Sequence, residues 1–153
     1  MNAVWTNPGN HAKLMKIYEH SEIQEEKVKI LNGLIYSKDT KVIIKTLDYC
    51  LTEKVRFSNV FYVLSGAADN PFAKQLVLDW LISNWNEFKK RIGGHGGTLL
   101  RKFVKIVVPI CAIEHPEKAK KFLIENKTSG LEKTFLQVQE ELEIHLNFIK
   151  RNK

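Results

Sequence analysis

Residues 55–103 read VRFSNVFYVLSGAADNPFAKQLVLDWLISNWNEFKKRIGGHGGTLLRKF, and this segment has the features of helices joined by short turns. Asn70-Pro71 marks a boundary, because asparagine caps a helix well and proline at the first helical position loses no needed hydrogen bond. The helix that starts there is expected to run to about Ile92, with apolar residues at steps of three and four. The glycine-rich run at residues 93–97 then ends it.

The same spacing of apolar residues continues on both sides of this segment, and alternation of period two is nowhere sustained. We therefore predict an all-α fold of about eight helices. The first four helices are expected at about 10–20, from Ser21 with a capping box to Gln24, at about 39–52, and from Ser58 as a cap. The fifth is expected at about 70–92, and the sixth from Thr98 as a cap until Pro109 bends or ends it. The seventh is expected from His115-Pro116, and the eighth from Ser129 with a capping box to Glu132. The predicted apolar faces include Ile17, Ile44, Phe61, Phe72 and Trp85, and we expect Trp85 to lie in the core.

The predicted connections between helices are short, about two to six residues, so sequential helices are expected to be antiparallel neighbours. Stacked antiparallel pairs form a curved α-solenoid. We predict one helical domain over residues 1–153, with an irregular segment at residues 1–9. No fixed-period repeat is strong enough to name from the sequence alone.

The composition is that of an ordinary soluble globular protein, with 44% hydrophobic and 27% charged residues in a chain of 153. The longest uncharged apolar run, Ile106 to Ile113, is far shorter than the ~20 residues a membrane-spanning helix needs. The first residues lack the basic start and apolar segment of an export signal. We expect no membrane association and a cytoplasmic location. Cys50 and Cys111 lie in apolar helical stretches, which favours buried thiols over a disulfide.

The net charge of +7 allows an acidic partner, and nucleic acid is one candidate. The basic clusters lie mostly at predicted helix ends, where cations meet the negative end of the helix dipole. They are Lys89-Lys90-Arg91, Arg101-Lys102, Lys118 to Lys121 and Lys150 to Lys153. We therefore favour a solvated basic surface and expect no nucleic-acid partner. The glycine run at 93–97 fits a helix connection better than a phosphate-binding loop, since such a loop follows a strand.

One segment carries a family resemblance. Residues 55–71, VRFSNVFYVLSGAADNP, resemble the C-terminal helical domain of the M1 family of zinc aminopeptidases, of the puromycin-sensitive, tricorn-interacting-factor and endoplasmic-reticulum type. The residues that follow at the family's spacing are Leu76, Asp79, Leu81, Asn84, Trp85 and Glu87. The resemblance is close from Val55 to Gly97 and looser from Asn10 to about Arg151. The chain departs from the family at Ala73 and Leu78, where glycine and tryptophan are frequent, and at Ser58-Asn59, which stands for Gln-Asp.

This resemblance implies a HEAT/ARM-like stack of helices that acts as a noncatalytic domain. In such enzymes the domain closes over the zinc-bearing catalytic domain, caps the active-site chamber and controls peptide access. The implied partners are that catalytic domain, in cis or as a separate subunit, and peptide substrates. The implied parent activity is removal of N-terminal residues from peptides, with zinc bound in the catalytic domain and no cofactor in this chain.

The residues themselves offer no catalytic or metal site. A zinc aminopeptidase needs two histidines one helical turn apart with a glutamate beside the first. None of the five histidines, His11, His20, His95, His115 and His145, has another four residues away. The family's Gly-x-Met-Glu-Asn motif is also missing, since Met1 and Met15 are the only methionines.

For contact with peptide we predict Arg56, Arg101 and Lys105, because a cation in the chamber attracts the C-terminal carboxylate of a peptide. The alternative, from a different class of function, is an independent basic helical scaffold that binds an acidic protein or nucleic acid.

Overall fold

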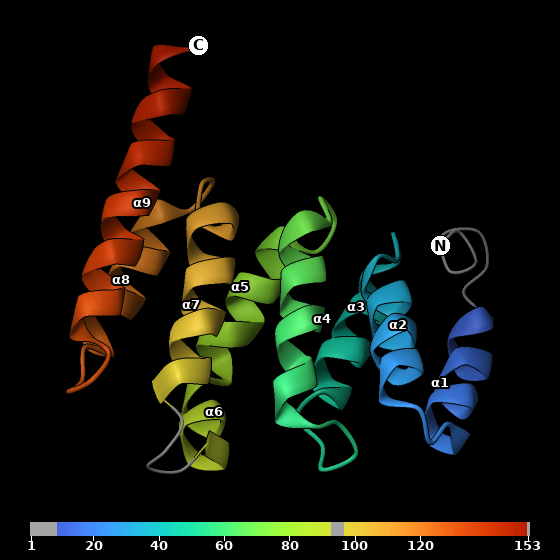
Figure 1. Cartoon of the computed structure of the whole chain (residues 1–153). Helices are drawn as coiled ribbons and strands as arrows, with labels where there is room; N and C mark the ends of the chain where they lie inside the picture. The colour runs from blue at the N-terminus through green and yellow to red at the C-terminus, as the bar shows by residue number, and fades with distance from the viewer. Residues whose placement is uncertain (1–8, 93–96, 153) are drawn as a thin grey trace. The chain divides into compact units, whose positions relative to one another are not determined.

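The computed structural model describes residues 9–92 and 97–152, and within these ranges it contains nine helices and no strand (Figure 1). The all-α prediction is confirmed. The helices are α1 Asn10–His20, α2 Gln24–Ile35, α3 Thr40–Tyr49, α4 Phe57–Asp69, α5 Lys74–Ser83, α6 Trp85–Ile92, α7 Gly97–Cys111, α8 Pro116–Glu125 and α9 Glu132–Arg151. The predicted irregular segment at 1–9 and the glycine run at 93–96 lie almost wholly outside the described residues.

The described residues form nine helices where about eight were predicted, because the expected helix over 70–92 is two helices, α5 and α6, separated at Asn84. The side-chain Nδ2 of Asn84 donates to the carbonyl of Trp80 at 2.8 Å, and the same carbonyl accepts the backbone N–H of Asn84 at 3.0 Å. Asparagine side chains that bond nearby backbone groups compete with regular helix geometry. A turn at residues 71–73 precedes α5, so the helix starts later than Asn70-Pro71 predicts.

The chain forms two compact units, Met1–Val77 and Leu78–Lys153, with the boundary inside α5. In the first unit α2 contacts α1, α3 and α4. In the second unit α9 contacts α7 and α8, and α7 contacts α6. The predictions of a single domain and of a curved solenoid remain predictions.

The core of the first unit depends on a buried polar contact and a close helix approach. Asn70, which is fully buried, donates from Nδ2 to the carbonyls of Ile35 at 2.8 Å and Ser37 at 2.9 Å. Its Oδ1 accepts from the backbone N–H of Phe72 at 3.0 Å. Gly66 of α4 lies against α2, where a β-carbon would meet Cγ2 of Ile35 at 2.9 Å. Together these contacts hold the end of α2 against α4.

The core of the second unit is aromatic. Phe88 of α6 makes edge-to-face contacts with Trp80 and with Phe103 of α7, each at 5.4 Å between ring centroids. Trp85 packs on Phe122 of α8 at 5.2 Å and near Phe135 of α9 at 6.2 Å. Such pairs stabilise a core beyond the apolar area they bury.

Several predicted caps are wrong, although each lies near a real helix end. Helix α2 begins after Ile23, and the Oγ of Ser21 accepts from the N–H of Ile23 at 3.2 Å and donates to Glu26 without forming a capping box. Ser58 lies inside α4, whose cap residue is Arg56. Leu131 precedes α9, with no side-chain cap from Ser129.

At the two ends of α7 the outcome is similar. Helix α7 begins at Gly97, so Thr98 lies in its first turn and does not precede it. Pro109 lies inside α7, two residues before the helix ends at Cys111. The predicted end of the helix near Pro109 is thus confirmed to within a few residues.

Some residues on the predicted apolar faces are exposed, namely Ile17 (48%), Ile44 (42%) and Phe72 (48%), and Phe61 is half-buried. A helix of a small stack buries only the part of its apolar face that meets a neighbour, and spacing alone does not show where that part ends. Cys50 and Cys111 are buried free thiols, as predicted. In the described ranges no helix is both long and apolar enough to span a membrane.

Candidate functional site

The described part of the chain brings together no group of three or more His, Cys, Asp or Glu side chains that suits a metal ion. Two of its histidines bond backbone carbonyls instead. His20 Nδ1 lies 2.8 Å from the carbonyl of Lys16, and His145 Nδ1 lies 3.0 Å from the carbonyl of Pro109. Because a carbonyl only accepts, Nδ1 carries the hydrogen in both rings. His145 therefore ties α9 to the C-terminal turn of α7.

His11 of α1 differs from these two histidines. Burial, with a smaller effect of the nearby Lys45 ammonium, lowers the pKa of His11 below its ordinary value. The neutral ring is thereby favoured.

The three predicted peptide-contacting cations lie in different places. Arg56 is exposed at the start of α4 in the first unit. Arg101 and Lys105 lie one turn apart on α7 in the second unit. The Arg101 guanidinium donates to the carbonyl of Gly130 at 3.0 Å and to Thr98 Oγ1 at 3.1 Å, while Lys105 is exposed. Arg101 thus braces the loop between α8 and α9, and peptide contact by the three residues remains a prediction.

A hollow of about 460 Å³ opens in the first unit, which we call the tyrosine hollow; it is lined by Tyr18, Glu19, His20, Lys27, Tyr49 and Lys54. The rings of Tyr18 and Tyr49 meet edge to face at 5.6 Å. The Tyr18 hydroxyl donates to the carbonyl of Lys54 at 3.0 Å, and the Lys54 ammonium bonds Glu19 at 2.8 Å. The ammonium of Lys27 lies 4.9 Å from the centroid of the Tyr18 ring.

Burial and neighbouring charges shift the pKa values of three side chains in the tyrosine hollow. Burial, with smaller effects of Tyr49 and Cys50, raises the pKa of Tyr18 to about 12. Burial and the Glu19 carboxylate raise the pKa of Tyr49. The hydrogen bond from Lys54 lowers the pKa of the exposed Glu19. Both tyrosines therefore stay neutral at physiological pH, and the hollow presents hydroxyl groups, ammonium groups and one carboxylate.

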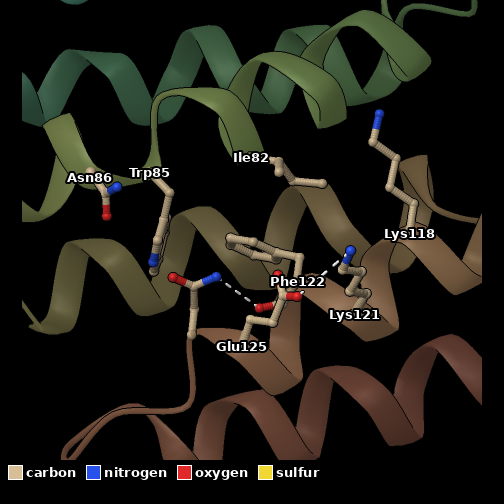
Figure 2. A pocket seen from close by; sticks show the side chains of 8 residues that line it. Ile82, Trp85, Asn86, Lys118, Lys121, Phe122 and Glu125 are labelled. Carbon is tan, nitrogen blue, oxygen red and sulfur yellow. Dashed lines mark hydrogen bonds and ion pairs between the residues drawn. The ribbon is translucent and has the colours of Figure 1, made fainter.

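A second hollow, of about 350 Å³, lies in the second unit, and we call it the tryptophan hollow. Its lining comes from the end of α5, the start of α6, and α8 with the residue that follows it: Ile82, Trp85, Asn86, Lys118, Lys121, Phe122, Glu125 and Asn126 (Figure 2). Trp85 and Phe122 project toward each other from α6 and α8 (Figure 2). Both are buried, at 2% and 3% exposed.

The charged side chains of the tryptophan hollow are paired unequally. Lys118 bonds Asp79 at 2.5 Å. Lys121 lies 3.7 Å from Glu125, and these two side chains are 75% and 58% exposed. An exposed pair at that distance contributes little to stability. The Lys121 ammonium is therefore free to exchange its partner at small cost.

Sequence reasoning placed Trp85 in the core and missed both hollows. The apolar pattern of the sequence did not indicate that α6 begins at Trp85 or that this helix lines a hollow together with α8. Lys118 to Lys121 were noted as a basic cluster without the aromatic residues beside them. For the tyrosine hollow, the residues are spread over residues 18–54, and their convergence depends on the packing of α1, α2 and α3.

Comparison with protein-family models identifies the family of the chain. A family model described as the ERAP1-like C-terminal domain matches residues 3–144. The chain belongs to this family. The match includes both compact units, and it confirms the resemblance seen in residues 55–71.

Relatives of this ERAP1-like domain are named aminopeptidases. Aminopeptidase M1-C of Oryza sativa subsp. japonica is 25% identical over 150 residues, which are 97% of this chain and 17% of that protein. Aminopeptidase M1 of Arabidopsis thaliana is 23% identical over 146 residues, 95% of this chain and 16% of that protein. Probable aminopeptidase 1 of Saccharolobus solfataricus is 22% identical over 133 residues, which are 86% of this chain and 17% of that protein. The chain thus spans only a small part of the curated relatives it matches, and it is a C-terminal domain of the M1 aminopeptidase family.

Proposed function

We propose that this domain caps the active-site chamber of a zinc aminopeptidase and controls which peptides enter it. One observation carries the proposal: nearly the whole chain matches a C-terminal domain family, yet it corresponds to only 16–17% of relatives named aminopeptidases. The matched segment is a small part of such an enzyme, and the catalytic domain is formed by residues outside it. Capping of the chamber and control of peptide access are the roles that the resemblance to M1 aminopeptidases implies for their C-terminal domain.

In this proposal the catalytic domain, in cis or as a separate subunit, supplies the zinc and the reaction. This chain contributes contacts to the peptide and no catalytic group in this proposal. Its own contribution to binding is positive charge. Arg56 and Lys105 are exposed cations, and Arg101 precedes Lys105 by one turn of α7. Charge-assisted bonds to a peptide carboxylate are the strong kind.

We also propose a cytoplasmic location. The support is the state of the two cysteines, Cys50 and Cys111, which are buried as free thiols. Thiols persist in reducing compartments, whereas exported domains tend to form disulfides.

The proposal is tested by peptide hydrolysis in the presence and absence of this chain. The zinc-bearing aminopeptidase region from the same source is assayed on a series of peptides of increasing length and on a single-residue chromogenic substrate such as leucine p-nitroanilide. A capping domain is expected to change the dependence of kcat/KM on peptide length far more than the rate on the small substrate. An equal effect on all substrates, or none, would contradict a role in peptide access.

The second candidate, a basic scaffold for an acidic protein or nucleic acid, rests on the net charge of +7. Labelled duplex DNA titrated at two salt concentrations separates the two functions. Affinity that falls steeply with salt, by about tenfold or more between 50 and 200 mM, would favour the scaffold. Absence of binding at low salt favours the capping domain.

A further inference from the structure

The tryptophan hollow combines an apolar floor with charged side chains at its rim. Its volume of about 350 Å³ is at the lower end of the range for small-molecule sites. All of its lining residues belong to the second unit, so the hollow is complete within α5, α6 and α8 and the residue that follows α8. It therefore suits a compact ligand.

One lining residue, Trp85, carries a polar atom that none of the described residues satisfies. The indole nitrogen Nε1 of Trp85 is buried, and no hydrogen-bond acceptor is found for it among the residues that the structure describes. The Trp85 side chain is 2% exposed. A buried donor without an acceptor costs about 1–3 kcal/mol and calls for an explanation. A ligand that offers an acceptor oxygen at this floor would supply one.

The rim determines the charge of that ligand. Two ammonium groups, Lys118 and Lys121, line the hollow with one carboxylate, Glu125. Lys118 is already held at 2.5 Å by Asp79, whereas Lys121 is 3.7 Å from Glu125. Lys121 is thus the cation available to an incoming anion. A second negative charge on the ligand would find no further free cation and would lie near Glu125, so the rim suits a monoanion.

We propose that the tryptophan hollow binds a compact monocarboxylate with a short apolar body. Its apolar part lies on Trp85, Phe122 and Ile82, its charge is balanced by Lys121, and one carboxylate oxygen accepts the Nε1–H of Trp85. Because Nε1 is covered, rim side chains move when the ligand enters. Lys121 and Glu125 suit this movement, since both are largely exposed and their pairing is weak.

The inference is tested on the whole chain by NMR of its ¹⁵N-labelled indole groups, with the Trp85 signal assigned from the variant Trp85→Phe. The probe is 4-methylpentanoate, and its matched neutral control is 4-methylpentanamide. The carboxylate is expected to shift the Trp85 Nε1–H resonance saturably in the millimolar range, while the amide shifts it much less. No shift with the carboxylate, or an equal shift with the amide, would overturn the proposal and leave an indole directed only at aromatic neighbours.

Two surface variants of equal size sharpen the result. Lys121→Gln removes the proposed counter-ion and is expected to weaken binding about threefold or more. Glu125→Gln removes its competitor and is expected to strengthen binding by a similar factor. Both residues are exposed on α8, so neither change threatens the fold. Equal affinity in both variants would contradict the assigned role of Lys121.

A further arm distinguishes the source of the carboxylate. The tripeptide acetyl-Gly-Gly-Leu is compared with its C-terminal amide and with the free acid probe. A response to the tripeptide that exceeds the response to 4-methylpentanoate identifies a polypeptide end as the ligand, and the reverse identifies a small free acid. The experiment needs no catalytic domain, so its failure leaves the test of peptide access unaffected.

Discussion

Replacing Asn70 with alanine is expected to destabilise the first unit severely. The side chain is fully buried and bonds three backbone groups: the carbonyls of Ile35 and Ser37 and the N–H of Phe72. In Asn70→Ala these groups lose their partners. Each buried unsatisfied group costs about 1–3 kcal/mol. With partial relaxation we expect a total loss of about 3–6 kcal/mol, a large share of the 5–15 kcal/mol typical of a whole domain.

The assay is urea unfolding followed by circular dichroism at 222 nm. Asn84→Ala is the matched control, because Asn84 is only half-buried and the carbonyl of Trp80 keeps the backbone N–H of residue 84 as a partner. This control is expected to change the free energy of unfolding by about 1 kcal/mol or less. A loss below about 1 kcal/mol in Asn70→Ala would refute the assignment of Asn70 as the polar link between α2 and α4.

Asn70→Asp separates hydrogen bonding from volume. The aspartate fits the same space but places an acceptor oxygen against two carbonyls, so ionisation in the folded state is disfavoured and the folded pKa rises above the unfolded value. The unfolded chain then loses its proton first. The variant is therefore least stable at neutral pH and recovers part of its stability as the pH falls toward about 4. A pH-independent deficit would contradict this explanation.

Four further substitutions have defined outcomes. Gly66→Ala brings a β-carbon to 2.9 Å from Ile35 and is expected to lower the free energy of unfolding in urea by about 1–2 kcal/mol. In its control, Gly33→Ala, the β-carbon meets no atom within 4 Å, so the free energy of unfolding is expected to rise by up to about 1 kcal/mol. Equal effects of the two variants would contradict the close approach of α4 to α2. Tyr18→Phe is expected to remove the part of the tyrosinate absorbance at 295 nm that rises near pH 12. Because the folded pKa of Tyr18 lies above the unfolded value of about 10, the parent chain loses stability as the pH rises from 10 to 12. The same loss of stability in the variant would show that another group causes it. Gly130→Ala places a β-carbon at φ +87° and is expected to cost about 1–2 kcal/mol by thermal or urea unfolding, so an unchanged midpoint would argue against that conformation.

The fold class was predictable from the spacing of apolar residues, and so were most helix positions. Helix ends were less predictable, because serine is common near a helix start without capping it: Ser21 bonds Glu26 and Ser58 lies inside α4. The division at Asn84 was missed since the apolar pattern continues through it. The structure adds what the pattern does not show, a bond from the Asn84 side chain to the Trp80 carbonyl at this point.

The candidate sites were predictable to a smaller extent. The sequence gives the cations Arg56, Arg101 and Lys105 but not their partners, and the structure shows that Arg101 bonds the carbonyl of Gly130 across 29 residues of sequence. The tryptophan hollow depends on the approach of α6 to α8. That approach joins Trp85 to Phe122, which are 37 positions apart. Contacts at such separations follow from packing, and the local pattern does not specify them.

The most direct test of the central claim, that this chain is the noncatalytic domain of an aminopeptidase, is the zinc content and aminopeptidase activity of the purified chain alone. After dialysis against zinc and gel filtration, elemental analysis and hydrolysis of leucine p-nitroanilide are measured on the same sample. The account predicts far less than one zinc ion per chain and no hydrolysis above the buffer rate. One tightly held zinc ion per chain, together with hydrolysis that a chelator abolishes, would contradict it.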